Sequence, residues 1–521
     1  MKKTIALAII VLLGISLGAW LWLKPGEGGK LPPASLAEQY GISVSNPLVA
    51  DVGLSILEQG GNAVDATIAV SLALTVVEPF GSGIGGGGIM LVHPGANQQP
   101  QALDYRDVYP FSGTKPQGNT GIPGLVRGLE TAHSQWGSLP WEDLVEPALE
   151  LAQNGFAVDD YFVQRLKINR GRLPVNELPH IFPDGEPLAA GDQLVQPELA
   201  ETLKRIGSQG AEGFYSGAVA QSVAAKMGVP ASDLEQYQAR LTSPVEGSFQ
   251  GYQVYSAPAP ASGITLIQIL QMMENQTDAD EVEFIHDLTS IVSTAFADRI
   301  KSVADPEFEN VDSQHLSSMD YSRQLAEVDA EKEIEEEPDD GNTTHFVIVD
   351  GDGMMVSTTN TLSTFFGSGQ YVEGFFLNDQ MKNFSSPNSI NGPEPGKRSR
   401  SFMAPTILVK DGRPVIGIGG PGGNRIPQVM AQVLARHLIF GQSMNEAIAA
   451  PRFYLNGKVL YLEEGTSQDV RFRLPEKGYP VATQPSHMLV GAIKSLTIDY
   501  QDNLLSGGVD QRRNGIFRWS H

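Results

Sequence analysis

The stretch GNTTHFVIVDGDGMMVSTTNTL, residues 341–362, decides the fold of this chain. Two β-rich runs flank a Gly/Asp turn at residues 351–353, a pattern typical of a β-hairpin. If these three residues close the hairpin, Asp350 faces Met354 and the pairing continues residue by residue toward the open end. This register places Thr343 opposite Thr361.

The composition of the chain restricts the class of protein. Of 521 residues, 41% are hydrophobic and 18% are charged, as in globular proteins. The formal net charge of -24 argues against a nucleic-acid partner, because phosphate contacts need clustered Lys and Arg. Cysteine is absent, which excludes disulfides, thiolate metal sites and cysteine nucleophiles. We predict neither a metal site nor a cofactor.

The N-terminus predicts export. Two lysines precede an uncharged run at residues 4–23, which is long enough to span a bilayer as a helix. Residues 1–24 therefore form a signal peptide or a membrane anchor, and Trp20 and Trp22 favour the anchor, because tryptophan suits the membrane interface. Residues 25–38, which are rich in Gly and Pro, follow as a linker. We expect the protein on the periplasmic or extracellular side, anchored to the inner membrane.

The rest of the chain predicts layers of helices and antiparallel strands. Residues 48–77 indicate two helices separated at Gly60-Gly61, and no alternation of strands and helices points to a parallel sheet. The glycine run at residues 81–88 lacks the Lys-Ser/Thr ending of a phosphate loop, so tight packing between layers is the favoured reading. Glycines at 420–424 precede a helix, where backbone N–H groups either bind an anion or form a simple turn.

A threonine hydroxyl is a weak nucleophile and needs a base. If the chain is cut before Thr343, the new α-amino group, with an ordinary pKa of about 7.7–8.0, becomes a base on the nucleophile's own residue. The acidic segment at residues 326–340 suits such a cut. The alternative is that the threonine pair is ordinary strand sequence.

Several motifs together resemble the γ-glutamyltransferase (γ-glutamyltranspeptidase) family. They lie in collinear order over about residues 40–455. The motifs are GGNAVDA (60–66), VEPFGSGIGGGG (77–88), GIPG (121–124), AFADR (295–299), TTH (343–345), NTLSTFFGSG (360–369) and PGGNR (421–425).

The resemblance implies an N-terminal-nucleophile hydrolase: a four-layer αββα sandwich, cut autocatalytically between Asn342 and Thr343. The products would be a large chain, 39–342, and a small chain, 343–521, that together form one catalytic domain. By position in the motifs, Thr343 resembles the nucleophile and Thr361 the hydroxyl that positions it. The remaining matches are Gly422 and Gly423 with the oxyanion hole, Arg106 with the arginine that binds the donor carboxylate, and Gln380 and Ser401 with other substrate-pocket positions.

The pocket departs from the family pattern on the side that binds the donor amine. Asn383 stands where the family has an aspartate, and Ser363 where it has an asparagine. Phe402 replaces the second serine of a Ser-Ser pair, with Arg400 just before that pair. An ammonium ion needs a charged partner when it is desolvated. Acyl groups without a free α-amine are therefore expected to be preferred.

The resemblance implies acyl transfer from γ-glutamyl or glutaryl-like amides, such as glutathione-type compounds, to water or amines. One alternative is a cephalosporin-acylase-like amidase or one that processes poly-γ-glutamate, with Arg398 and Arg400 offsetting the negative charge of the protein. The other is a non-catalytic, membrane-tethered binding protein of the same fold.

Overall fold

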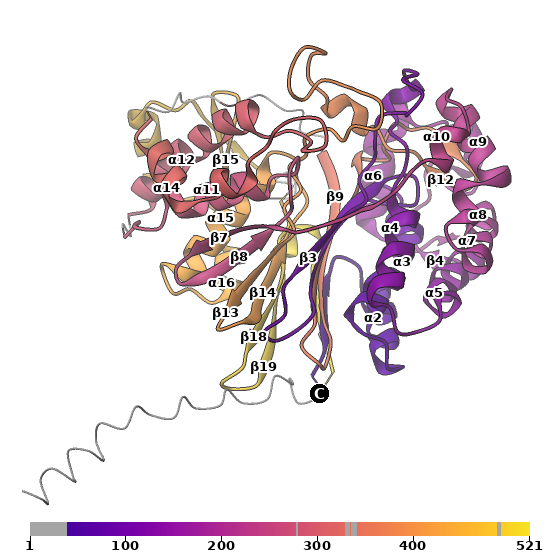
Figure 1. Cartoon of the computed structure of the whole chain (residues 1–521), viewed down its shortest axis with the longest axis horizontal. Coiled ribbons are helices and arrows are strands. Elements are labelled where there is room, and N and C mark those ends of the chain that lie inside the picture. Colours follow the sequence, from indigo (N-terminus) through magenta and orange to yellow (C-terminus); the bar gives the residue numbers. More distant parts are fainter. Residues whose placement is uncertain (1–38, 278–279, 329–333, 335–340, 487–490, 521) are drawn as a thin grey trace, which may run out of the picture. The chain divides into compact units, whose positions relative to one another are not determined.

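Two antiparallel sheets form the centre of the molecule (Figure 1). The structure is a computed structural model that describes residues 39–277, 280–328, 334, 341–486 and 491–520. In this part of the chain one sheet has seven strands, in the order β20-β1-β9-β10-β2-β3-β6, and the other has six, in the order β19-β18-β14-β13-β8-β7. The predicted segments at residues 4–23 and 25–38 lie outside the described residues.

The bounds of the strands follow the order of the sheets. The first sheet comprises β20 Ile516–Trp519, β1 Gly41–Val44, β9 Gly341–Val349, β10 Met355–Thr364, β2 Gly87–His93, β3 Gln101–Asp104 and β6 Arg240–Thr242. The second comprises β19 Leu504–Gly508, β18 Lys494–Asp499, β14 Arg413–Gly419, β13 Thr406–Lys410, β8 Tyr252–Ser256 and β7 Val245–Phe249. A smaller sheet comprises β15 Phe453–Asn456, β16 Val459–Glu463 and β17 Val481–Gln484.

Helices cover the outer face of each sheet (Figure 1). On the first sheet the helices are α2 Pro47–Glu58, α3 Ala63–Val77, α4 Leu125–Trp136, α5 Trp141–Asn154, α6 Asp160–Asn169, α7 Pro197–Gln209, α8 Glu212–Tyr215 and α9 Gly217–Met227. On the second they are α11 Gly263–Met272, α12 Glu281–Ser302, α14 Met319–Ala326, α15 Arg425–Leu438 and α16 Met444–Ala449.

Alternation along the strands produces the layers. On β9, Phe346 and Ile348 face the core shared with α2 and α3, while Val347 and Val349 face the second sheet. Leu408 of β13 points the other way, into the core beneath α11, α12 and α15. The arrangement is the αββα sandwich that the family resemblance implied.

The hairpin has the predicted register. Residues 344–349 of β9 pair with residues 360–355 of β10, and the turn closes with Asp350 N donating to Met354 O at 3.1 Å. A bulge then shifts the pairing, so that Asn342 stands opposite Ser363. The bulge leaves Thr343 facing residues 361 and 362, at the open end of the hairpin.

The glycine run packs closely against neighbouring backbones, including that of β10 in the same sheet. A Cβ on Gly86 would lie 2.2 Å from the carbonyl oxygen of Thr361, and one on Gly88 would lie 2.5 Å from that of Thr359. On Gly85 it would lie 2.1 Å from Phe376 O. A larger residue at these positions would push β10 away, so the glycines let the strand that carries Thr361 approach closely.

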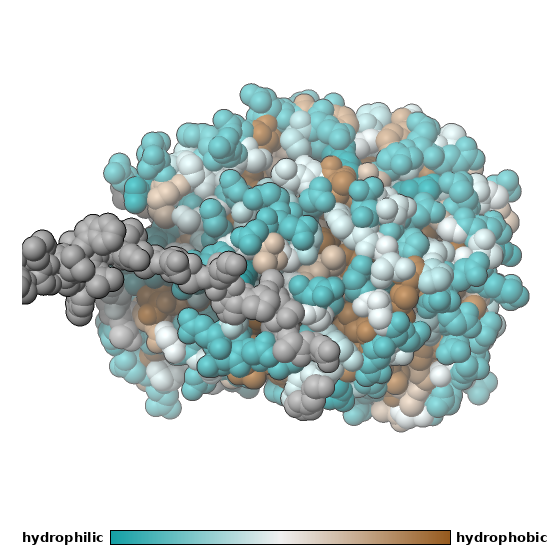
Figure 2. Space-filling model, turned by 60° about the horizontal axis from the view of Figure 1, so that its bottom comes forward, coloured by the Kyte–Doolittle hydropathy of each residue, from teal (hydrophilic) through white to brown (hydrophobic). Residues whose placement is uncertain are grey.

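The face drawn in Figure 2 is mostly hydrophilic, with apolar residues dispersed among polar ones. Within the described ranges, no helix has both the length and the apolar character needed to cross a membrane.

Candidate active site

The two threonine hydroxyls predicted to meet do meet. Thr343 Oγ1 lies 3.2 Å from Thr361 Oγ1, and both residues are buried. The Thr361 hydroxyl donates to the carbonyl oxygen of Asn342 at 2.7 Å and accepts from Ser363 N at 2.8 Å. Ser363 has a φ of 83°, which belongs to the bulge. One hydroxyl therefore touches both the Thr343 side chain and the peptide that precedes it.

Asn342, the residue before the predicted cut, is held from the first sheet's helical side. Its side-chain amide donates to the carbonyl oxygen of Phe80, and this carbonyl also accepts from Phe366 N at 3.0 Å. Asn342 Oδ1 is buried and has no hydrogen-bond partner among the described residues. Asn342 is thus held by its side-chain amide and by its main-chain carbonyl, the latter through Thr361.

His345 does not supply the base. Burial, with a smaller contribution from the nearby Lys494, lowers the pKa of its imidazole to about 3, so the ring is neutral. Its Nδ1 lies 2.8 Å from Thr359 Oγ1, and its ring packs under Gly419, where a Cβ would lie 2.4 Å from Cε1. His345 is therefore a packing residue between the sheets.

The second glycine-rich loop follows β14 toward Thr343. A Cβ on Gly417 would contact Val347 at 2.5 Å, and Gly419 contacts His345, so β14 runs antiparallel to β9 across the two sheets. Continuing this alignment by two residues predicts that the loop at 420–424 comes over Thr343. Gly422 and Gly423 have φ values of 136° and 57°, which favour glycine. Their role as an oxyanion hole stays a prediction.

Arg106 lies just after the end of β3 and is separated from Thr361 by Gly87 of β2. The register pairs Thr361 with Gly87, and a Cβ on Gly87 would lie 2.8 Å from the Cα of Arg106. Asp104 orients the guanidinium, because its Oδ1 accepts from Arg106 Nε at 3.2 Å and its Oδ2 accepts from Nη2 at 2.7 Å. The carbonyl oxygen of Ser399 accepts from Nη1 at 2.9 Å. Burial would raise the pKa of Asp104, but Arg106 and Arg398 bring it down to about 2. The arginine is thus a preoriented cation.

Gln380 and Asn383 lie next to this arginine. Ser399, which accepts from Arg106, donates through Oγ to Gln380 O at 3.4 Å. The Asn383 amide donates to Gln380 Oε1 at 2.7 Å. Asp379 ties the same segment to β10, since its carboxylate accepts from Thr364 N at 3.1 Å. Arg106, Gln380 and Asn383 are therefore brought together near the end of β10.

Ser401 and Phe402 belong to a neighbouring group of side chains. Ser262 Oγ donates to Ser401 O at 2.8 Å and accepts from Arg299 Nε at 3.1 Å. The Arg299 guanidinium stacks on the Phe402 ring, 3.8 Å from its centroid. The substituted phenylalanine therefore packs against the arginine of the AFADR motif.

Arg398 and Arg400, which the sequence interpretation expects to offset the protein's negative charge toward a polymer, are both buried in the structure. Arg398 is buried, 3.3 Å from Asp104. Arg400 is also buried; its guanidinium donates to Ile300 O at 2.9 Å, near the end of α12, and to Ser385 Oγ at 3.0 Å. A helix C-terminus attracts cations, so Arg400 serves the packing of α12.

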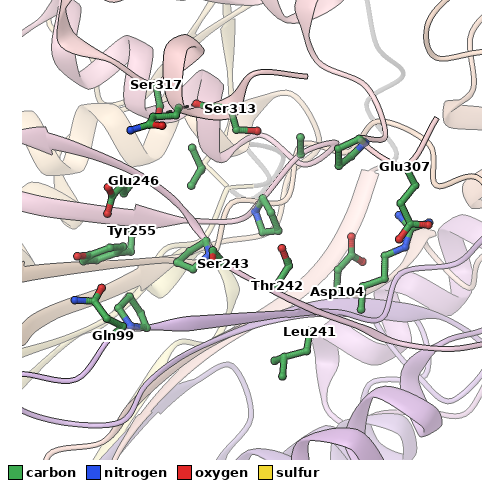
Figure 3. Close-up of a pocket in the computed structure, with 18 residues that line it drawn as sticks. Gln99, Asp104, Leu241, Thr242, Ser243, Glu246, Tyr255, Glu307, Ser313 and Ser317 are labelled. Atoms are coloured by element: carbon green, nitrogen blue, oxygen red, sulfur yellow. Dashed lines mark hydrogen bonds and ion pairs between the residues drawn. The ribbon is translucent and has the colours of Figure 1, made fainter. Parts of the chain in front are cut away.

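A cavity of about 850 Å³ opens where β6 and β7 form adjacent edges of the two sheets (Figure 3). Its wall includes Asp104, Glu246 and Tyr255, and Figure 3 shows Ser313 and Ser317 on the opposite side. Neither Thr343 nor Arg106 is among the residues described as lining it. It shares Asp104, which orients Arg106, with the candidate site.

Sequence reasoning missed the residues that support the site from afar. Asp104 precedes Arg106 by two positions, and this spacing at a strand end could have indicated the pair. Arg513, which donates to the Thr343 carbonyl oxygen at 2.7 Å, lies 170 residues away in the chain. No local pattern marks it.

Comparison with known proteins agrees with this geometry. The chain matches the family described as Gamma-glutamyltranspeptidase over residues 49–518. It is 40% identical to the capsule biosynthesis protein CapD proenzyme of Bacillus anthracis, over 99% of this chain and 98% of the relative. It is 33% identical to the glutathione hydrolase proenzyme of Bacillus subtilis (strain 168), over 99% and 98%.

A solved structure shares the fold. The cephalosporin acylase from Bacillus halodurans superimposes with a TM-score of 0.84 at 26% identity, covering 92% of this chain and 96% of that one. The match over most of the sequence and the shared sandwich lead to one conclusion. The chain belongs to the γ-glutamyltranspeptidase family of enzymes, which hydrolyse or transfer γ-glutamyl amide bonds.

Proposed function

We propose that this protein is a self-processing amide hydrolase and acyltransferase with Thr343 as its nucleophile. The observation that carries the proposal is the contact of 3.2 Å between Thr343 Oγ1 and Thr361 Oγ1, with Thr361 also bound to the Asn342 carbonyl oxygen. The relatives named above are proenzymes, which supports a cut that yields chains 39–342 and 343–521.

Self-cleavage would begin at the same hydroxyl pair. Thr343 Oγ1 attacks the carbonyl carbon of Asn342, the C–N bond breaks and the nitrogen of Thr343 takes a proton. The resulting ester between Asn342 and the Thr343 side chain is then hydrolysed by water. The Thr361 hydroxyl, 2.7 Å from the Asn342 oxygen, stabilises the charge that develops there. The product is a free α-amino group on Thr343.

In turnover this amino group accepts the proton from Thr343 Oγ1 as the oxygen attacks the acyl carbon of the donor. Backbone N–H groups of Gly422 and Gly423 stabilise the oxyanion, and the proton passes to the departing amine. Water or an acceptor amine then releases the acyl group from Thr343. No metal or cofactor takes part in this scheme.

The donor would be a γ-glutamyl or glutaryl-like amide. Arg106, oriented by Asp104, would bind its carboxylate, with Gln380 and Ser401 along the pocket. Asn383 and Ser363 offer no charge to an ammonium group, and Phe402 adds an apolar surface. Acyl groups without a free α-amine therefore fit this pocket better.

A second candidate function is the processing of an acidic capsule polymer. The relative of 40% identity is named for capsule biosynthesis, which favours it. Because Arg398 and Arg400 are buried, the polymer would have to bind with its carboxylates mostly in solvent. Release of short fragments from poly-γ-glutamate, measured by size, would support this candidate, and an unchanged polymer beside an active anilide assay would exclude it.

For the N-terminus we propose residues 1–24 as a membrane anchor or signal and 25–38 as a linker. Residues 4–23 would place the protein at the outer side of the inner membrane. Fractionation of cells expressing the full chain, with N-terminal sequencing of the large chain, tests this assignment.

The first test is Thr343→Ala. We expect the wild-type protein to give two fragments on a denaturing gel, with the smaller one beginning at Thr343, and the variant to remain one chain. Hydrolysis of a glutaryl or γ-glutamyl anilide should fall by about 1000-fold or more, because the nucleophile is lost. Thr343→Ser, which keeps a hydroxyl, is the matched control and should retain both cleavage and turnover. An intact wild-type chain would contradict the proposal.

The second test concerns the pocket. We expect the ratio of kcat/KM for glutaryl anilide to that for γ-glutamyl anilide to exceed one, since Asn383 cannot neutralise the α-ammonium group. Asn383→Asp should raise γ-glutamyl turnover by about 10-fold, the effect of roughly 1.4 kcal/mol of added binding. Asn154→Asp adds the same charge at an exposed position at the end of α5 and should leave the turnover of both anilides unchanged. A strong preference of the wild type for the γ-glutamyl compound would refute the pocket assignment.

A further inference from the structure

The main-chain carbonyl of Thr343 is held from outside the hairpin. In the bulge the opposing Leu362 N donates to Gly81 O at 3.2 Å rather than across the ladder. The Thr343 carbonyl oxygen accepts instead from Arg513 Nη1 at 2.7 Å. Arg513 therefore replaces the missing strand partner at the residue predicted to be the nucleophile.

Glu78, at the end of α3, completes the arrangement. Its Oε2 lies 3.5 Å from Arg513 Nη2 and accepts from Thr344 Oγ1 at 3.0 Å. Its Oε1 accepts from Ser45 Oγ at 2.6 Å. The pair thus binds two consecutive residues of β9: Arg513 binds the main chain of Thr343, and Glu78 binds the side chain of Thr344.

Both charges are almost fully removed from solvent. The side chains of Glu78 and Arg513 are each 6% exposed. A buried ion pair is weak as a source of stability, because desolvation offsets most of the attraction. Its location beside Thr343 suggests a role in positioning and electrostatics instead.

We propose that Arg513 and Glu78 are positioning residues that fix the Thr343 backbone and set the proton affinity of its freed α-amino group. This inference rests on the proposed function, in which that amino group is the general base. The arginine acts through Thr343 and does not touch the substrate.

The two charges act in opposite directions on the amino group. A cation on the Thr343 carbonyl lies on the order of 5 Å from the nitrogen of the same residue, where it disfavours an ammonium ion. The Glu78 carboxylate favours the ammonium ion. Arg513 therefore keeps the amine unprotonated, and Glu78 limits this effect.

Other charges also reach the pair, and the pKa of Lys494, which burial lowers to about 8, responds to both of its members. Lys494 of β18 and Arg165 of α6 couple to Arg513 as cations. Asp510 lies between Arg452 and Arg512, at 2.5 Å and 3.3 Å. His345 is neutral. The opposite signs expected for the two single variants, rather than the size of either shift, therefore report Glu78 and Arg513.

The test measures the α-amino group directly. Processed protein is methylated with formaldehyde and a borohydride at a series of pH values, and modification of the small chain's N-terminal peptide is quantified by mass spectrometry. The pH at which methylation of the α-amino group is half-maximal is the midpoint of each series. We expect Arg513→Gln to move this midpoint upward by roughly one pH unit and Glu78→Gln to move it downward by a similar amount. The double variant should return close to the wild-type midpoint. The acidic limb of kcat/KM should shift with each midpoint.

Arg513→Lys and Glu78→Gln separate positioning from folding. Arg513→Lys keeps the charge but not the planar fork, so its midpoint should stay while kcat falls. Glu78→Gln keeps an acceptor for Thr344 and decides the question alone if Arg513→Gln is not processed. In the two charge-removing variants, Arg513→Gln and Glu78→Gln, midpoints that stay at the wild-type value, or that move in the same direction, would overturn the proposal. A lower activity with an unmoved midpoint in these two variants would show a purely structural role and also overturn it.

The same measurement keeps the two levels of inference apart. If the wild-type protein has no α-amino group at residue 343, the proposed function fails. If that amine is present but its methylation midpoint is the same in both variants as in the wild type, only the proposed role of Arg513 and Glu78 is refuted.

Discussion

Thr343 and His345 show how burial assigns roles to single residues. Both lie on the same face of β9, yet the hydroxyl meets a second hydroxyl while the imidazole meets a glycine backbone and a threonine. Desolvation keeps His345 neutral, with a pKa of about 3. His345, the more usual type of catalytic residue, is therefore the packing residue, and Thr343 is the candidate nucleophile.

Lys494 is a cation for which burial is costly. It is 1% exposed, and its Nζ has no hydrogen-bond partner in the described part of the chain. Burial lowers its pKa from 10.5 to about 8, with Asp510 opposing the shift. Below pH 8 the folded protein must hold this desolvated ammonium group, whereas the unfolded chain hydrates it.

We therefore expect Lys494→Met to raise the stability of the folded protein at pH 7, by an amount on the order of 2–3 kcal/mol. Between pH 8 and 10.5 the unfolded state binds more protons than the folded state, so the wild type gains stability as the pH rises. The advantage of the variant should shrink over that window and vanish above it. Thermal unfolding midpoints measured from pH 7 to 10.5 check this.

Lys167→Met, at an exposed position of α6, is the matched control and should show no such trend. A Lys494→Met variant that is less stable than the wild type at pH 7 would show that the ammonium group is stabilised by its surroundings and would contradict the prediction.

At the scale of elements, most of the fold could be predicted because its signals are local. The helices at 48–77 follow from capping and from an apolar stretch interrupted by glycines, and α2 Pro47–Glu58 and α3 Ala63–Val77 match them. The hairpin register follows from the three-residue turn. The bulge at residues 361–362 could not be predicted from the turn. Thr361 pairs with Gly87 of β2, which is distant in the sequence, while its pairing with β9 is interrupted.

The glycine run provides a test at this scale. Gly86→Ala should place a methyl group 2.2 Å from the carbonyl oxygen of Thr361, so β10 must shift. We expect self-cleavage and anilide turnover to fall by at least about 10-fold, because small displacements of reacting groups are costly, and stability to fall by about 1–3 kcal/mol. Cleavage time courses and kcat/KM measure the effect.

Gly83→Ala is the control within the same run, since its added Cβ would only touch Thr75 Cγ2 at 3.7 Å. Equal behaviour of the two variants would show that close packing on β10 does not position Thr361.

At the scale of the whole molecule, the proposed cut leaves the two chains interleaved. β9 and β10, almost entirely in the small chain, lie between β1 and β2 of the large chain, and β20 pairs with the other side of β1. Hydrogen bonds of one sheet thus join the two products on several edges. Cleavage would free the α-amino group of Thr343 without separating the nucleophile from Arg106, which lies on the large chain.

The sequence by itself determined the layered antiparallel fold, the hairpin and the meeting of Thr343 with Thr361, because turn residues and strand alternation are local properties. The tertiary structure alone decided what supports that meeting. Arg513 reaches Thr343 across 170 residues, and Asp104 rather than solvent orients Arg106. It also showed that Arg398 and Arg400, expected to offset the negative charge of the protein, are buried. Burial and ion pairing depend on which distant segments pack together, and residue spacing along the chain does not encode that.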